Sequence, residues 1–98
     1  MAKWETVGQI GVDAGLCWLG DPCYIMGKDA GEQPAKTWSE FCDDLHKREN
    51  RGAAQWNYKH GHAGLGVTVT TGFGDGTYPV QVKRTSEGRI SEVRIKFI

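Results

Sequence analysis

The sequence lacks the features that mark several specialised classes of protein. It has no apolar run long enough to span a membrane and no secretory apolar segment after Met1, so we expect neither a membrane protein nor an exported one. It has no surplus of charge either, since 12 Lys and Arg balance 12 Asp and Glu. A neutral chain lacks the basic character that draws proteins to nucleic acid, so a nucleic-acid polymer is not the partner we expect.

Cysteine is scarce, with three residues, an odd number that cannot all pair within one chain. Together with the missing secretory segment, this predicts free thiols and a cytoplasmic location. No two of the cysteines have the Cys-x-x-Cys spacing of a structural zinc site, and His60 with His62 supplies only two ligands. We therefore predict no metal site and no cofactor.

Glycine and tryptophan, by contrast, are abundant. The 98 residues include 14 glycines and 4 tryptophans, and 39% of the chain is hydrophobic. Many glycines indicate many tight turns, and large aromatic side chains indicate either a bulky core or an aromatic-lined surface. The length predicts a single domain over residues 1–98, with a modest core.

Short strands are predicted wherever apolar and polar residues alternate between turn residues. Residues 53–60 fit either a strand or an ordered loop, and residues 86–89 fit a hairpin turn. Pro79 cannot donate to a ladder, so we expect its strand to avoid a central position in the sheet. The other predicted strands cover residues 4–13, 16–19, 23–26, 65–70, 78–83 and 93–97.

One helix is predicted near residues 38–50. Thr37 can cap it, and Glu40 three residues later completes a capping box. The apolar stripe that we expect to face the core consists of Trp38, Phe41, Cys42 and Leu45.

Together these elements predict an α+β fold with about six or seven short strands. The hairpin succession favours a mainly antiparallel sheet, curled towards a sandwich or a small barrel, with the helix packed across it.

The most constrained backbone is predicted in the glycine-rich segment that surrounds Asp75. A phosphate-binding loop would need a helix after it, whereas a strand follows here, so we reject that function. Two interpretations remain. In the favoured one, the segment is a turn whose backbone amides Asp75 caps. In the other, the loop amides and Asp75 bind a ligand or a partner.

Aromatic and basic side chains suggest a second kind of site, in which a base stacks on a ring and a phosphate meets an arginine. The alternative is that the aromatic residues fill the core and the charges solvate an outer face. No catalytic residue is predicted, although Cys23 follows a turn where a thiol could be exposed. The candidate ligand- or partner-binding residues are Asp21, Tyr24, Trp56, Gly74, Asp75, Gly76, Tyr78 and Arg94.

Several strings carry a resemblance to a known family. They include Gly20-Asp21-Pro22, Gly88-Arg89 and, most specifically, Gly74-Asp75-Gly76-Thr77-Tyr78-Pro79-Val80. The chain resembles a family of uncharacterised bacterial and phage domains, the domain of unknown function 4241, and is similar to small hypothetical proteins of tailed phages. The resemblance implies a β-rich fold and no established activity, so it assigns no catalytic residue.

A small, neutral chain without an assembled catalytic set favours a non-enzymatic binding protein. We expect a phage or mobile-element accessory factor that binds a host protein, such as a defence protein, in a fixed stoichiometry. The alternative is sequestration of a small anionic ligand such as a nucleotide signal, and a third hypothesis is a small hydrolase that uses Asp21, Asp75 or Cys23. A homo-oligomer is compatible with each of these.

Overall fold

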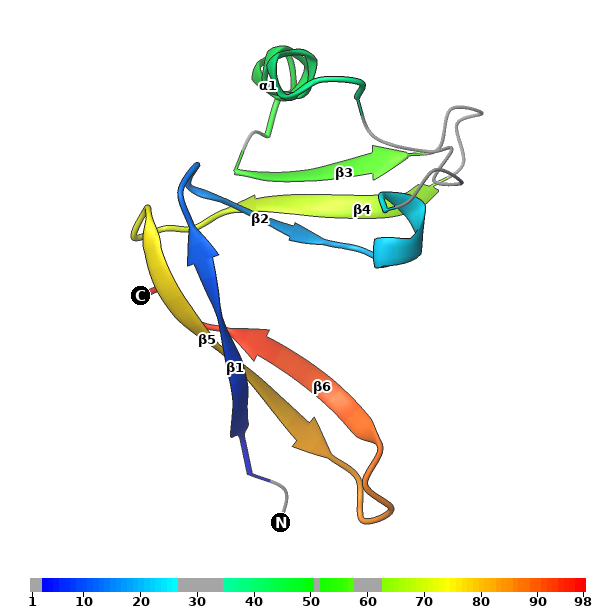
Figure 1. Ribbon diagram of the computed structural model, residues 1–98, viewed down its shortest axis with the longest axis vertical. Helices are drawn as coiled ribbons and strands as arrows, with labels where there is room; N and C mark the ends of the chain where they lie inside the picture. Colours follow the sequence, from blue (N-terminus) through cyan, green and yellow to red (C-terminus); the bar gives the residue numbers. More distant parts are fainter. Residues whose placement is uncertain (1–2, 27–34, 51, 58–62) are drawn as a thin grey trace. The chain divides into compact units, whose positions relative to one another are not determined.

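The computed structural model describes residues 3–26, 35–50, 52–57 and 63–98 (Figure 1). The chain divides into two compact units, which are described separately below. Unit 1 contains Met1–Gly15 and Thr71–Ile98, and unit 2 contains the intervening Leu16–Thr70. Unit 2 therefore interrupts the sequence of unit 1, and the single domain stays a prediction.

The α+β class is confirmed. In the part of the chain that the structure describes, six strands form two antiparallel sheets of three strands each, and one α-helix accompanies them. Among the described residues, no helix is long and apolar enough to cross a membrane.

Unit 1 is built on the sheet β1-β5-β6. Its strands are β1 (Glu5–Val12), β5 (Gly76–Arg84) and β6 (Ile90–Ile95), as Figure 1 shows. The hairpin turn between β5 and β6 is confirmed, because the N–H of Thr85 donates to the carbonyl of Arg89 at 2.8 Å. The last strand begins and ends earlier than the predicted 93–97.

Pro79 does not keep its strand at an edge, so that prediction is wrong. Strand β5 is the central strand of unit 1, and Pro79 lies opposite Gln9 of β1. On the other side, the pairing of β5 with β6 begins only at Val80, which faces Ile95. Pro79 therefore lies beyond the last β5–β6 pair, where the ladder on that side needs no donor.

Unit 2 is built on the sheet β2-β4-β3, accompanied by the helix α1 (Trp38–His46). Its strands are β2 (Leu16–Leu19), β3 (Ala53–Asn57) and β4 (Ala63–Thr70). Strand β3 confirms the strand alternative for the first part of 53–60; the rest of that range lies outside the described residues. The buried cluster of this unit consists of Phe41, Leu45, Ala54, Trp56 and Leu65.

The capping box of α1 is confirmed. The Thr37 hydroxyl oxygen accepts a hydrogen bond from the N–H of Glu40 at 3.1 Å, and the Glu40 carboxylate accepts one from the N–H of Lys36 at 3.2 Å. The helix ends at His46, earlier than predicted. It ends there because the chain tightens: the N–H of Lys47 bonds to the carbonyl of Asp44, three residues back.

The segment after Gly20 is a 3₁₀-helix, η1 (Pro22–Tyr24), so the predicted strand at 23–26 is wrong. Asp21 caps it, because its carboxylate Oδ1 accepts a hydrogen bond from the N–H of Cys23 at 3.0 Å. Pro22 occupies the first position, where its fixed φ suits a helical turn and its missing donor costs nothing. An Asp–Pro pair therefore starts a helical turn here.

Trp18 lies flat against Gly66 of β4. A Cβ placed on Gly66 would come within 2.1 Å of the Trp18 ring, so only glycine leaves room for the indole. The same ring meets Phe41 of α1 edge-on, at 6.5 Å between ring centres. Its indole N–H is buried and finds no acceptor among the described residues.

We expect Gly66→Ala to lower the free energy of unfolding by about 1–3 kcal/mol, because the added methyl must displace the Trp18 ring. Gly11→Ala is the matched control, because a Cβ there meets nothing within 4 Å, and we expect it to change stability by less than about 0.5 kcal/mol. Urea denaturation measures both variants. Equal stability of the two would contradict the close approach of Trp18 to β4.

Candidate functional site

The glycine-rich segment of the sequence forms a turn, Thr71–Gly76, which we call the 71–76 turn. It begins with a β-turn in which the N–H of Gly74 donates to the carbonyl of Thr71 at 2.7 Å. Gly74 has a φ of +106°, so a residue with a side chain would be strained there. The glycine at this position is therefore required by the backbone, as the sequence predicted.

Two side-chain hydroxyls fix the turn by donating to one carbonyl oxygen. The Thr71 hydroxyl donates to the carbonyl of Gly74 at 2.6 Å, and the Tyr78 hydroxyl donates to the same oxygen at 2.5 Å. Both side chains are buried, and the Tyr78 ring meets Phe97 edge-on at 5.1 Å between centres. The Gly74 carbonyl and N–H are thus both satisfied, which holds the turn in one conformation.

Thr71 also ties the turn to the segment that follows β1. Its N–H donates to the carbonyl of Gly15 at 2.9 Å. Gly15 is the last residue of unit 1 before unit 2 begins, and Thr71 is the first residue of unit 1 after unit 2 ends. Gly15 has a φ of +67°, in the left-handed region that glycine adopts without strain.

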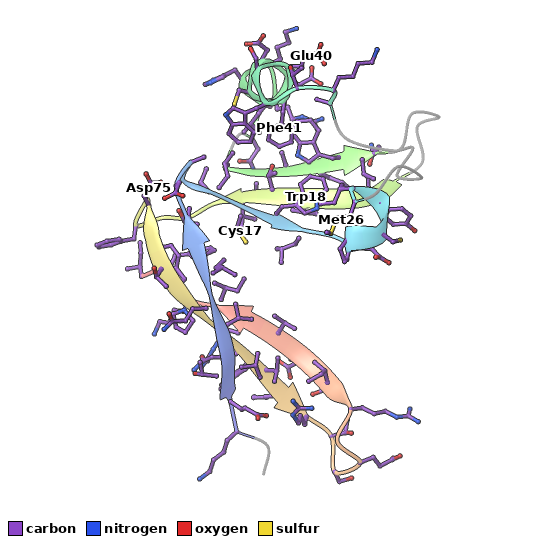
Figure 2. The ribbon with its side chains drawn as sticks, viewed as in Figure 1. Cys17, Trp18, Met26, Glu40, Phe41 and Asp75 are labelled. Carbon is purple, nitrogen blue, oxygen red and sulfur yellow. The ribbon has the colours of Figure 1, made fainter. Side chains whose placement is uncertain are left out.

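Asp75 does not cap the turn, contrary to the favoured interpretation. No described residue donates a hydrogen bond to the Asp75 carboxylate; the turn is held by the hydroxyls of Thr71 and Tyr78, which donate to the Gly74 carbonyl. The residue is exposed, and Figure 2 shows it at the start of β5. Its carboxylate is therefore accessible to water or to a partner. The adjacent residue, Gly76, begins β5 and pairs with Val12 of β1.

Phe73 is a feature of this turn that the sequence-based candidates missed. Its side chain is 74% exposed, on the β-turn closed by Thr71 and Gly74. The adjacent Gly72 lies beside Ile98, whose Cδ1 is 3.0 Å from the place of a Cβ on that glycine. Ile98 is 81% exposed, so the turn carries an apolar patch at the surface. The signal in the sequence is an aromatic residue between two glycines, which offer no side chains to cover it.

Trp56, one of the candidate binding residues, lies in the core of unit 2. It is 2% exposed, and its ring stacks on Phe41 with 4.4 Å between centres. The guanidinium of Arg48 lies 3.9 Å from the centre of the same ring, and the indole N–H donates to the Thr68 hydroxyl at 3.0 Å. With these neighbours, Trp56 offers no ring face on which a base could stack.

Arg94 is likewise engaged within its own sheet. Its guanidinium donates two hydrogen bonds to Oε1 of Gln81, at 3.1 and 2.7 Å, and lies 4.2 Å from the centre of the Trp4 ring. The Lys83 ammonium lies 4.8 Å from the same ring centre. These contacts hold Arg94 against unit 1.

Asp21 and Tyr24 belong to unit 2, at the two ends of η1. Asp21 caps η1, and Tyr24 is half-buried against the core cluster. Hydrogen bonds from Cys23, first from its backbone N–H, lower the pKa of the Asp21 carboxyl. The hydrogen bond to Asp21 in turn raises the pKa of the Cys23 thiol, because ionisation would lose that bond and bring two negative charges together.

The eight candidates are thus divided between the units. Unit 1 holds Gly74, Asp75, Gly76 and Tyr78 in or beside the 71–76 turn, and Arg94 on its sheet. Unit 2 holds the other three. Three or more potential metal ligands do not gather anywhere in the part of the chain that the structure describes; the predicted pair His60 and His62 lies outside that part.

The chain belongs to the family described as Protein of unknown function (DUF4241), which matches residues 7–95. The family resemblance inferred from the glycine-rich string is therefore confirmed, and it now extends across the helix. No curated protein and no solved structure matches the chain.

Tyr78→Phe and Thr71→Val should each lower the free energy of unfolding by about 1 kcal/mol, because each removes one hydroxyl donor. We expect the double variant to lose at least about 0.5 kcal/mol more than the sum, since only then does the Gly74 carbonyl lack both donors. Thermal unfolding of the four proteins measures this coupling. Strictly additive losses would show that the two hydroxyls do not serve one acceptor.

The raised thiol pKa predicts slow alkylation of Cys23 at mildly alkaline pH, because less of the thiol is ionised at a given pH. Asp21→Asn keeps an oxygen acceptor for the cap but removes the charge, so we expect the pKa of Cys23 to fall and its reaction with iodoacetamide to quicken. Mass spectrometry of the separate cysteines across a pH series gives the rates, with the buried Cys17 as an internal control. An unchanged pH profile would refute the pairing with Asp21.

Proposed function

We propose that the chain is a non-catalytic binding protein that contacts a partner protein at the 71–76 turn. One observation carries this proposal: Phe73 is 74% exposed on a turn whose Gly74 carbonyl is fixed by two hydroxyl donors. The same turn presents the accessible carboxylate of Asp75.

A large, exposed aromatic side chain on an ordered turn suits protein recognition for two reasons. Large anchors that enter a pocket of the partner supply much of the binding energy at protein interfaces. An anchor that is already ordered in the free protein loses little conformational entropy on binding. Phe73 is a large exposed side chain on a backbone held by the hydrogen bonds to Gly74, and Ile98 beside Gly72 enlarges the exposed apolar surface.

The two alternative functions have less support. Of the residues predicted to hold a nucleotide, Trp56 and Tyr78 are buried and Arg94 is engaged with Gln81 and Trp4. A cysteine hydrolase would need an activated thiol, whereas the hydrogen bond to Asp21 raises the pKa of Cys23.

The origin and the location of the protein stay predictions. We propose a phage or mobile-element accessory factor that binds a host protein in the cytoplasm, and a bacterial lysate is therefore the material in which to seek the partner.

Capture from a bacterial lysate tests the binding surface. We expect the wild-type chain to recover one dominant partner, and we expect Phe73→Ala to weaken that complex by about 30-fold, the loss of about 2 kcal/mol that defines an anchor residue. Quantitative mass spectrometry identifies the partner, and titration with the purified partner gives the affinity.

Val93→Ala is the matched control, because Val93 is 58% exposed on β6, outside the turn. It should leave the affinity within about twofold, since a contact outside the interface contributes little. The proposal fails if Phe73→Ala and Val93→Ala behave alike, or if the wild-type chain repeatedly recovers no partner.

A further inference from the structure

Unit 2 contains an apolar hollow beside the start of α1, which we call the α1 hollow. Its volume is about 340 Å³, and it lies among Trp18, Ile25, Ala35, Lys36, Trp38 and Phe41. Figure 2 labels two of its walls, Phe41 on α1 and Trp18 on β2. Hydrophobic side chains make up most of this lining, so the hollow suits an apolar group.

Trp38 lines the hollow with a ring that is fixed in place and yet exposed. The ring stacks on Phe41 with 5.4 Å between centres and 14° between planes, and Phe41 stacks on Trp56 in turn. Arg48 lies against Trp56 at the end of this series. Even so, Trp38 is 60% exposed, contrary to the prediction that it faces the core. A partner side chain that covers this ring would bury apolar surface without the entropy cost of ordering the Trp38 side chain.

A second hollow on α1 gives the surface its charge. It lies among Glu40, Asp43, Asp44 and Lys47, and it shares Ala35 with the α1 hollow. Three carboxylates and the Lys47 ammonium line it, and the Lys36 ammonium lines the α1 hollow beside it, so the two hollows together carry a net negative charge. An anionic ligand is disfavoured beside them, whereas an arginine or lysine is attracted.

We propose that the α1 hollow binds a short segment of a partner protein that carries a bulky aromatic or apolar side chain next to arginine or lysine. The apolar side chain enters the α1 hollow against Trp38, and the basic residue lies over Asp43 and Asp44. This surface belongs to unit 2 and is independent of the function proposed for the 71–76 turn.

Synthetic peptides test this recognition with the full chain, by calorimetry at low salt. The first peptide has one tryptophan, with two arginines before it and two arginines after it. The second has aspartates in place of the arginines, and the third has alanine in place of the tryptophan. We expect the first to bind, and we expect each of the others to bind at least about tenfold more weakly, since each lacks one of the two features.

Variants of the chain separate the two contributions. Trp38→Ala should weaken the tryptophan peptide at least about tenfold, and Asp43→Asn with Asp44→Asn should reduce the preference for arginine over aspartate by a similar factor. Met26→Ala is the matched control, because Met26 is 67% exposed but does not line the hollow. Phe73→Ala should bind the peptide as the wild type does, which distinguishes this site from the 71–76 turn.

Three results would overturn the proposal. The first is that no peptide binds, and the second is that the basic and acidic peptides bind equally well. The third is that a second copy of the chain fills the hollow. In that case the mass measured by sedimentation would rise with protein concentration in the absence of peptide, and Trp38→Ala would abolish the rise.

Discussion

The carbonyl oxygen of Gly74 is the acceptor on which the 71–76 turn depends. The hydroxyls of Thr71 and Tyr78 both donate to it, while the N–H of Thr71 reaches back to Gly15. One residue, Thr71, thus connects the segment after β1 to the turn that leads into β5. Because Tyr78 lies on the central strand of unit 1, the turn is fixed by the sheet itself. These bonds hold the backbone of the turn that carries the exposed Phe73, on which the proposed binding surface is centred.

Unit 2 depends on aromatic packing in a comparable way. Phe41 lies between Trp38 and Trp56, and the Arg48 guanidinium stacks on Trp56 while it donates to the carbonyl of Gln55 at 2.6 Å. The helix and β3 are therefore joined by stacked rings as well as by burial. This stacking supports Trp38 from one side, so the ring stays ordered although most of it is exposed. The same contacts order Trp38 and Phe41, which form one side of the α1 hollow.

The elements that the sequence predicted correctly are those set by local chemistry. The capping box of Thr37 and Glu40 placed the start of α1, a short apolar run placed β2, and alternation placed β4 and β5. The errors arose where a contact distant in sequence decides the outcome. The β5–β6 ladder begins only at Val80, so it needs no N–H donor from Pro79. The 71–76 turn is held by a hydroxyl that donates from Tyr78, and not by the Asp75 carboxylate. Exposure of Phe73 and Trp38 also depends on packing, which alternation and helical spacing do not specify.

The central claim is that the 71–76 turn is ordered before any partner binds. The backbone order parameters of Phe73 and Asp75, measured by ¹⁵N relaxation on the free protein, test it most directly. The bonding of Gly74 predicts values near those of β5, about 0.85 as in rigid backbone. Values below about 0.6 would show a flexible loop and would contradict the account of Phe73 as a preformed anchor.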